Sequence, residues 1–383
     1  MPRFTLPLLA LLILVHPSCA PAGAEPDEYD PSLDSLRFTG ELHLRNVRQM
    51  TFGGNNAEAY FSFDDSLLIF QSQWDEINPQ GCDQQFIMRV DGRPLASGEQ
   101  YRLVSTGEGR TTCGYFLPDG RIIYSSTHAA SRECPTPPPS DPGVYAWPIY
   151  SDYDIYIANP DGSNLELLIG GPHYDAEPTV SPDGRFIVFT SDRSGDMNLW
   201  RYEIASGELL QLTDELGYDG GAFFSPDASQ IVWRASRPQG AEAEEYQALL
   251  ARGLVQPGEV DLHVMDADGS NARRLIALPG ANWAPFFHPA GDRVLFSSNH
   301  HDEGGRLFDL FMIGLDGEGL TQITHSGAFD SFPMFSFDGT LLAFGSNRRI
   351  DRAASRETNV FVAEWVETPL AADSAFVMLE RTN

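Results

Sequence analysis

A short cassette recurs six times along this chain of 383 residues, and it constrains the fold more than any other feature. Each copy holds a polar residue, a short apolar run, a turn of the Ser-Pro-Asp-Gly type and a second apolar run. Pro-Asp-Gly favours a tight turn between two strands. The six turns are Ser62-Phe-Asp-Asp65, Leu117-Pro-Asp-Gly120, Ser181-Pro-Asp-Gly184, Ser225-Pro-Asp-Ala228, His288-Pro-Ala-Gly291 and Ser336-Phe-Asp-Gly339. They recur at intervals of about 44 to 64 residues. Since propeller blades of four strands recur every ~40 to 50 residues, the longer intervals leave room for insertions.

The third copy contains all the parts of one repeat. After the turn at residues 181–184 and a strand-like run ending at Ser191, two further runs follow at residues 198–204 and 209–213. A Ser206-Gly207 turn separates them. Four such runs joined by short turns are typical of a small antiparallel sheet. The sequence therefore predicts an all-β fold, a six-bladed β-propeller with four antiparallel strands in each blade.

The two ends of the repeat array complement each other. The sixth copy has three strand-like runs, the last ending at Trp365, and no fourth run follows it. Residues 44–51 resemble the fourth strands of the other copies and lead directly into the first copy. We predict that this N-terminal strand completes the last blade, because a closed ring leaves no free sheet edge.

We divide the chain into a signal peptide (1–24), an acidic linker (25–35), the propeller (36–367) and a C-terminal tail (368–383). The first segment has Arg3, an apolar run too short for a membrane span, and a small-residue cleavage site at Ala22-Gly-Ala24. We expect a periplasmic or secreted protein whose mature chain has no transmembrane span. Lipid anchoring through Cys19 is the alternative, although His16-Pro-Ser18 departs from the residues usual before an anchored cysteine.

The chain is strongly acidic. It has 54 Asp and Glu residues against 25 basic residues, all of them Arg, and a formal net charge of −29. This balance argues against nucleic acid and anionic membranes as partners. The absence of Lys fits an organism that lives in high salt, where screening reduces self-repulsion, and it fits equally a GC-rich codon bias.

Six polar residues begin the innermost strands, each six positions before the turn serine or its equivalent. They are Asn56, Thr111, Asp175, Asp219, Asn282 and Asp330. These strand starts open on one face of a propeller, here called the upper face, together with the loops that join each second strand to the third. We expect the six side chains to ring the mouth of the central channel, where their oxygen atoms suit Ca²⁺, a hydrated cation, or peptide amine and amide groups. The alternative is that they hold the strand starts by hydrogen bonds to the backbone.

Four aromatic residues lie beside these positions: Tyr174, Tyr218, Trp283 and Phe329. They are candidates for a rim that binds a peptide or a sugar. The alternative is that they pack between blades.

Three cysteines, Cys82, Cys113 and Cys134, remain after removal of the signal peptide, and all should lie on one sector of the upper face. An exported chain favours one disulfide and one free thiol, but the spacing does not say which two cysteines pair. The alternative is a soft-metal site that includes His128.

Several loops of the upper face also contain histidines or long insertions. His300-His-Asp302, His173 and His325 are candidates for metal ligands or bases, and solvent-facing loop histidines are the alternative. The proline-rich stretch 135–148 predicts an irregular cover over the second blade. The spacing of residues 241–252, followed by Gly253, predicts a short helix over the fourth blade.

The repeat pattern resembles a known family. Ser181-Pro-Asp-Gly184 with Phe189-Thr-Ser-Asp-Arg193, and Asn282-Trp-Ala-Pro285 with Phe296-Ser-Ser-Asn299, carry the resemblance. Over about residues 36–367 the chain resembles the propeller domain of the TolB family of bacterial envelope proteins. The resemblance implies a periplasmic, non-catalytic propeller that binds an envelope protein.

These observations predict an exported, non-catalytic propeller that binds a protein, peptide or glycan on its upper face, with a Ca²⁺ ion in the channel as an optional cofactor. The alternative is a metal-dependent polysaccharide lyase or hydrolase that uses the channel, with His173 and the channel carboxylates as its candidate residues. A peptidase of the prolyl-oligopeptidase type is disfavoured, because the sequence has no Gly-x-Ser-x-Gly motif.

Overall fold

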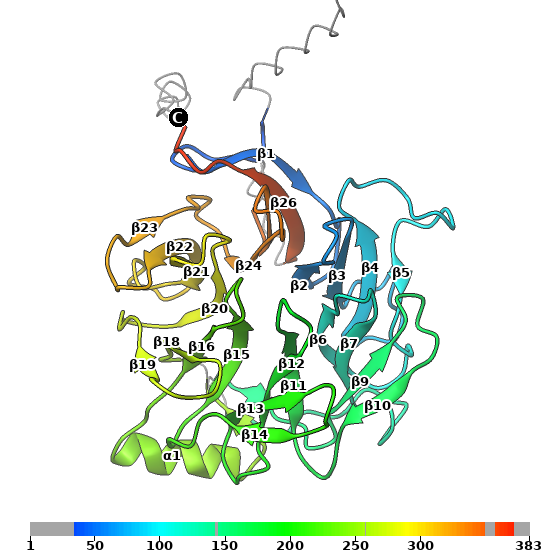
Figure 1. Cartoon of the computed structure of the whole chain (residues 1–383), viewed down its shortest axis with the longest axis vertical. Helices are drawn as coiled ribbons and strands as arrows, with labels where there is room; N and C mark the ends of the chain where they lie inside the picture. Colours follow the sequence, from blue (N-terminus) through cyan, green and yellow to red (C-terminus); the bar gives the residue numbers. More distant parts are fainter. Residues whose placement is uncertain (1–33, 142–144, 257, 349–356, 371–383) are drawn as a thin grey trace, which may run out of the picture.

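The computed structural model describes residues 34–141, 145–256, 258–348 and 357–370. The predicted signal peptide, nearly all of the predicted linker and residues 371–383 lie outside these ranges. Six four-stranded antiparallel sheets surround a central axis (Figure 1). The prediction of an all-β, six-bladed propeller is confirmed.

Each blade takes its innermost strand from one cassette. Blade 1 contains β2 (Asn56–Phe61), β3 (Leu67–Ser72), β4 (Gln84–Arg89) and β5 (Arg102–Leu103). Blade 2 contains β6 (Thr111–Phe116), β7 (Ile122–Ser126), β9 (Asp154–Ala158) and β10 (Glu166–Ile169). Blade 3 contains β11 (Asp175–Val180), β12 (Phe186–Ser191), β13 (Asn198–Glu203) and β14 (Leu209–Gln211). Blade 4 contains β15 (Asp219–Phe224), β16 (Gln230–Ala235), β18 (Asp261–Asp266) and β19 (Arg273–Arg274). Blade 5 contains β20 (Asn282–Phe287), β21 (Arg293–Ser298), β22 (Asp309–Gly314) and β23 (Thr321–Gln322). Blade 6 contains β24 (Asp330–Phe335), β25 (Leu341–Ser346), β26 (Asn359–Trp365) and β1 (Leu44–Gln49).

The ring closes as the sequence predicts. The N-terminal strand β1 pairs antiparallel with β26 and becomes the outer strand of the last blade. A buried ion cluster reinforces this closure: the Arg348 guanidinium contacts Glu41, which precedes β1, at 3.0 Å and Asp330 of β24 at 3.1 Å. All three side chains are fully buried. The N-terminal segment is therefore joined to the last blade by backbone pairing and by charge.

The repeated turns use one set of hydrogen bonds. In blade 3 the Ser181 hydroxyl donates to Asp183 at 2.6 Å and accepts the backbone N–H of Phe186 at 2.9 Å. Gly184 has a φ of 70°, which is readily adopted only by glycine. The same bonds recur at Ser225 and Ser336. Local turn chemistry thus sets the lower end of these inner strands.

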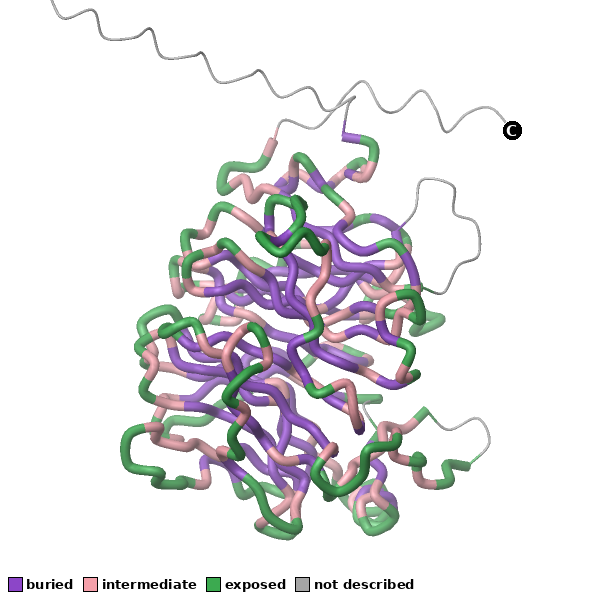
Figure 2. The backbone as a smooth tube through the Cα atoms, turned by 90° about the vertical axis from the view of Figure 1, so that its right-hand side faces the viewer, coloured by how far each residue is buried: buried purple, intermediate pink, exposed green. Residues whose placement is uncertain are grey.

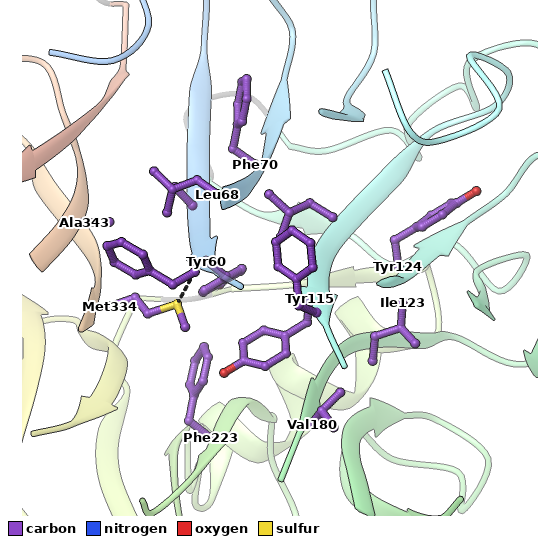
Figure 3. Close-up of a cluster of buried hydrophobic side chains, with 14 of the residues drawn as sticks. Tyr60, Leu68, Phe70, Tyr115, Ile123, Tyr124, Val180, Phe223, Met334 and Ala343 are labelled. Carbon is purple, nitrogen blue, oxygen red and sulfur yellow. Dashed lines mark hydrogen bonds between the residues drawn. The ribbon is translucent and has the colours of Figure 1, made fainter. Parts of the chain in front are cut away.

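The core lies between the sheets, where the strands are buried along most of their length (Figure 2). Near the axis, Tyr60, Tyr115, Phe223 and Met334 converge from four inner strands (Figure 3). The Tyr60 ring centroid lies 5.5 Å from that of Tyr115 and 5.7 Å from that of Phe223. Tyr60, Tyr115 and Phe223 form an aromatic layer across the channel.

The two predicted insertions meet above the ring. The proline-rich insertion of blade 2 contains β8 (Trp147–Pro148), and the insertion of blade 4 contains α1 (Ala241–Leu250) and β17 (Leu254–Val255). Strands β8 and β17 pair antiparallel, and the backbone N–H of Ile149 donates to the Gly253 carbonyl at 2.7 Å. We call α1, β8 and β17 together the lid. The predicted short helix is confirmed, and within the described ranges no helix is long and apolar enough to cross a membrane.

Candidate functional site

A β-bulge shapes every inner strand at the same place. In all six strands the pairing with the second strand shifts register after the second residue. The third residue adopts a left-handed backbone with φ between 46° and 58°. These residues are Glu58, Cys113, Glu177, Gly221, Ala284 and Phe332. A bulge re-aims the side chain that it carries, and all six of these residues line the central channel.

The predicted ring residues occupy the first position of each inner strand and are buried. Asn56, Thr111, Asp175, Asp219, Asn282 and Asp330 are each at most 1% exposed. They are not among the residues that line the channel. Their side chains instead bond to nearby loops: Asn56 donates to the Gly53 carbonyl, Thr111 to the Asp83 carbonyl and Asn282 to the Leu278 carbonyl. Their role in ligand binding stays a prediction.

Three of the six form the same ion pair. Asp175 pairs with Arg193 at 2.6 Å, Asp219 with Arg237 at 2.7 Å and Asp330 with Arg348 at 3.1 Å. Each Arg follows the second strand of the same blade. The pairs therefore tie the start of an inner strand to the loop that leaves its neighbour.

The bulge residues build a small polar chamber in the upper half of the channel. The Cys113 thiol donates to Glu58 Oε2 at 2.8 Å. Glu177 accepts hydrogen bonds from Arg234 and from the Tyr218 hydroxyl, both at 2.8 Å. The cavity of the chamber has a volume of about 20 Å³. This is room for about one water molecule.

Burial sets the protonation of this chamber. Desolvation raises the pKa of Glu58 to about 7, against a weaker opposing effect of the Cys113 hydrogen bond. Desolvation and the neighbouring Glu58 charge raise the pKa of the Cys113 thiol well above its usual value. Cys113 is therefore a protonated thiol at neutral pH, which is a poor nucleophile.

The lid roofs this chamber. The Trp147 ring stacks on Trp283 with centroids 5.4 Å apart and planes 13° apart. The Arg234 guanidinium carbon lies 5.3 Å from the centroid of the Trp147 ring. Trp147 thus links the proline-rich insertion to the channel wall.

The predicted rim aromatics lie beneath or beside the lid. Tyr174, Tyr218 and Trp283 are 6%, 2% and 8% exposed, and Phe329 is partly buried. Tyr174 and Tyr218 belong to one buried cluster with Tyr246 of α1 and Val255 of β17. Phe329 packs against Trp283. Their use as a ligand rim stays a prediction.

The structure separates the three cysteines. Cys82 and Cys134 form a disulfide with Cα atoms 6.0 Å apart, which joins blade 1 to the base of the proline-rich insertion. Cys113 is free and lies in the chamber. His128 bonds to Ser126 instead, with 2.9 Å between Nδ1 and the hydroxyl. The four predicted residues are not brought together as one metal site.

The loop histidines also have protein partners. His301 Nε2 lies 2.9 Å from Asp309, whose pKa burial raises to about 7. His173 lies 3.6 Å from Asp192, and His300 bonds to Ser298. Asp302 accepts the backbone N–H of Arg306, and the backbone N–H of His325 donates to Glu41. Across the described ranges, no group of three or more His, Cys, Asp or Glu side chains is arranged to hold a metal ion.

A groove opens on the upper face between the lid and blade 3. Its volume is about 470 Å³. Ile149, Leu250 and Leu216 supply apolar walls, and Asp192 supplies a carboxylate. Asp196 links the lid to blade 3. Its carboxylate accepts a hydrogen bond from the Tyr246 hydroxyl of α1 at 2.5 Å and another from the backbone N–H of Gly217 at 3.0 Å. We call this feature the lid groove.

Comparison with known proteins identifies the propeller type. No family model matches the chain. The Tol-Pal system protein TolB of Anaeromyxobacter dehalogenans is 28% identical over 221 residues, which are 56% of this chain and 46% of that protein. The solved structure of an Agrobacterium tumefaciens protein described as a TolB has a TM-score of 0.52 at 16% identity. The match covers 84% of this chain and 97% of that one. The chain is a TolB-like propeller.

Other propellers share the fold. A gluconolactonase from Xanthomonas campestris has a TM-score of 0.55 at 14% identity, covering 86% of this chain and 94% of that one. At such identity the likeness shows the fold alone, because one fold carries many activities. The TolB-like propeller also spans only about half the length of the curated relatives that it matches.

Sequence reasoning missed the chamber of the TolB-like propeller. The prediction placed the channel-facing residues at the first position of each inner strand, because the strand starts open on the upper face. The bulge instead turns the third residue of each strand toward the channel. Glu58, Cys113 and Glu177 stand two positions after the predicted ring residues, and aligning the six cassettes in that column would have found them.

Proposed function

We propose that this chain is an exported binding protein of the bacterial cell envelope, and that it recognises a segment of a protein partner in the lid groove. The observation that carries the proposal is the groove itself, formed where the insertions of two blades meet over the upper face. Loops held on a rigid scaffold are the usual place for recognition. Its volume of about 470 Å³ lies within the usual range of ligand pockets, roughly 300 to 1,000 Å³.

The chemistry of the groove favours a peptide segment over a glycan. Leu216 is 37% exposed and faces the same groove as Ile149 and Leu250, so an apolar partner side chain would cover surface that now contacts water. Asp192 would attract a basic group. The aromatic rings that would stack on a sugar, Tyr218 and Trp283 among them, are buried already.

The envelope assignment rests on two supports. The similar proteins are named as components of the Tol-Pal system, and residues 1–24 have the composition of an export signal. We therefore place the partner among proteins that face the periplasm. We favour this role over a metal-dependent lyase or hydrolase, because the described ranges hold no cluster of His, Cys, Asp or Glu side chains arranged for a metal ion.

Site-specific photo-crosslinking tests the groove. The chain is expressed with its own leader in a Gram-negative host, with a photoreactive phenylalanine analogue in place of Leu216. Leu320, which is 41% exposed on the edge of blade 5 against 37% for Leu216, provides a matched control. We expect a discrete adduct with an envelope protein at position 216 and none at 320. Equal labelling at the two positions, or none at either, would refute a groove-bound partner.

The mass of the mature N-terminus tests export. We expect cleavage after Ala24, so that the mature chain begins at Glu25 and is recovered from the periplasm or the medium. A lipid on Cys19 would establish anchoring instead. Retention of the full leader in the cytoplasm would contradict the envelope role.

A further inference from the structure

The lower mouth of the channel holds a second recess, independent of the lid groove. Its volume is about 130 Å³. Five blades contribute to its lining, so it lies on the propeller axis. Pro182, Pro226, Pro289 and Phe337 belong to the wall, and Tyr115 and Phe286 come from deeper in the channel. We call this recess the lower cup.

The repeated turn itself makes the cup apolar. The second position of the six turns carries Phe63, Pro118, Pro182, Pro226, Pro289 and Phe337. The Phe63 and Phe337 rings stack with centroids 4.2 Å apart. Behind them, the aromatic layer of Tyr60, Tyr115 and Phe223 separates the cup from the polar chamber. For comparison, an apolar cavity of roughly 150 Å³ accommodates benzene.

Carboxylates follow directly after three residues of the wall, Pro182, Pro226 and Phe337. The third turn position carries Asp in five of the six turns. Asp119 pairs with Arg121, and the other four, Asp64, Asp183, Asp227 and Asp338, are exposed. In the described part of the chain none of them forms an ion pair; each accepts hydrogen bonds from its own turn, as Asp227 does from Ser225 and Ser229. The serine hydroxyls lower the pKa of Asp64 and Asp227. Asp64 and Asp227 therefore stay ionised at neutral pH.

Nearby arginines do not neutralise these four carboxylates. Arg121 pairs with Asp119 of its own turn at 2.7 Å. The Arg185 guanidinium lies over the Phe186 ring, 4.8 Å from its centroid. An apolar recess beside carboxylates that form no ion pair in the described ranges is complementary to an apolar group flanked by cations.

We propose that the lower cup binds one aromatic or branched side chain of a basic peptide segment, whose Lys or Arg residues face Asp183, Asp227 and Asp338. The apolar side chain would leave water for a proline and aromatic lining. The cations would interact with exposed carboxylates, so the attraction depends on ionic strength. Because this site lies at the opposite end of the channel, it is independent of a partner in the lid groove.

Synthetic peptides test the proposal on the full mature chain. The probe is acetyl-Lys-Lys-Trp-Lys-Lys-amide with a fluorinated tryptophan, titrated by fluorine NMR. Two reference peptides replace either all Lys by Glu or the Trp by Ala. We expect the probe to bind at least about 10-fold more tightly than either reference peptide at low salt, and to weaken as salt screens the charges. Equal affinity for the probe and a reference peptide would overturn the proposal.

Substitutions locate the binding. The double variant D183N/D227N removes two charges and keeps an oxygen for the turn bonds, whereas D161N/D268N does the same in two outer hairpins with matching serine bonds. We expect weaker binding, by about 5-fold, in the first variant only. F337A keeps the backbone N–H that donates to Asp65, and it should weaken the probe without loss of cooperative unfolding.

Three results would refute a peptide site in the lower cup. The first is equal weakening by the turn and hairpin double variants. The second is unchanged affinity in F337A. The third is a change in the oligomeric state of F337A with no peptide binding to the wild type, which would assign the cup to a second copy of this chain.

Discussion

The two ends of the central channel differ although the same six cassettes build both. At the upper end, insertions of two blades pair through β8 and β17 and roof a polar chamber with Trp147. At the lower end, the turns themselves form an open apolar cup beside exposed carboxylates. The difference indicates where each surface can vary. The lower end repeats a turn that the fold requires, whereas the upper end carries loops that the fold leaves free.

The largest effect should come from the charges at the upper end. R348M would leave Asp330 and Glu41 buried without their cation, and breaking a buried pair costs about 3–5 kcal/mol. Denaturant unfolding measures this loss. The matched change R121M removes an exposed ion pair at a lower turn and should stay within about 0.5 kcal/mol of wild type. Similar losses in the two variants would show that the upper ion cluster has no special weight.

The disulfide should rank next. Replacing Cys82 and Cys134 together by Ser should lower the free energy of unfolding by about 2–4 kcal/mol, because the disulfide restricts the unfolded chain. The same change releases the base of the proline-rich insertion in the folded chain. Thermal unfolding with and without reductant measures the loss. C113S serves as the control and should respond to reductant as the wild type does. A double variant as stable as wild type would mean that the insertion is held by β8 and β17 alone.

The reactivity of Cys113 compares the two mouths directly. W147A removes the roof of the chamber, and we expect maleimide labelling of Cys113 to become about 10-fold faster, as expected when a reactive group gains access to solvent. F337A at the lower mouth should leave the rate nearly unchanged, because the aromatic layer stands between. Labelling that accelerates in F337A and not in W147A would reverse our assignment of the closed and separated ends.

The last prediction concerns the pH dependence of stability, which appears only above about pH 5. Glu58 has a pKa of about 7 when folded and an ordinary value of 4.5. The folded chain therefore holds a proton that the unfolded chain releases between these values. The stabilisation of the folded chain by this proton is complete below about pH 4.5, and it is lost as the pH rises through about 7. E58Q should remove this loss, so that at pH 8 relative to pH 5 the variant gains up to about 2.5 kcal/mol of unfolding free energy over wild type. Parallel pH curves for E58Q and wild type would contradict a protonated Glu58.

Much of the fold was predictable because its signals are local. The Ser-Pro-Asp-Gly turns specify their own hydrogen bonds, as at Ser181 and Asp183. The pairing of β1 with β26 followed from a missing fourth strand at one end and a spare strand at the other. The helix α1 followed from its spacing and the Gly253 stop. The resemblance to TolB rested on the same repeated residues.

The candidate sites were less predictable because they depend on geometry that no local pattern records. A bulge of one residue moved the channel lining from the predicted ring to Glu58, Cys113 and Glu177. The partner of Cys134 could not be chosen from spacing, and the structure pairs it with Cys82 across two blades.

The sequence by itself determined the number of blades, the turns and the closure of the ring, since periodicity and turn chemistry act over a few residues. Only the tertiary structure decided that two insertions separated by a whole blade meet as the lid, that one face is roofed, and that the other presents an apolar cup. The physical reason is that these surfaces are made by side chains from several blades. Their contacts depend on how the sheets twist and pack around the axis, which no single repeat specifies.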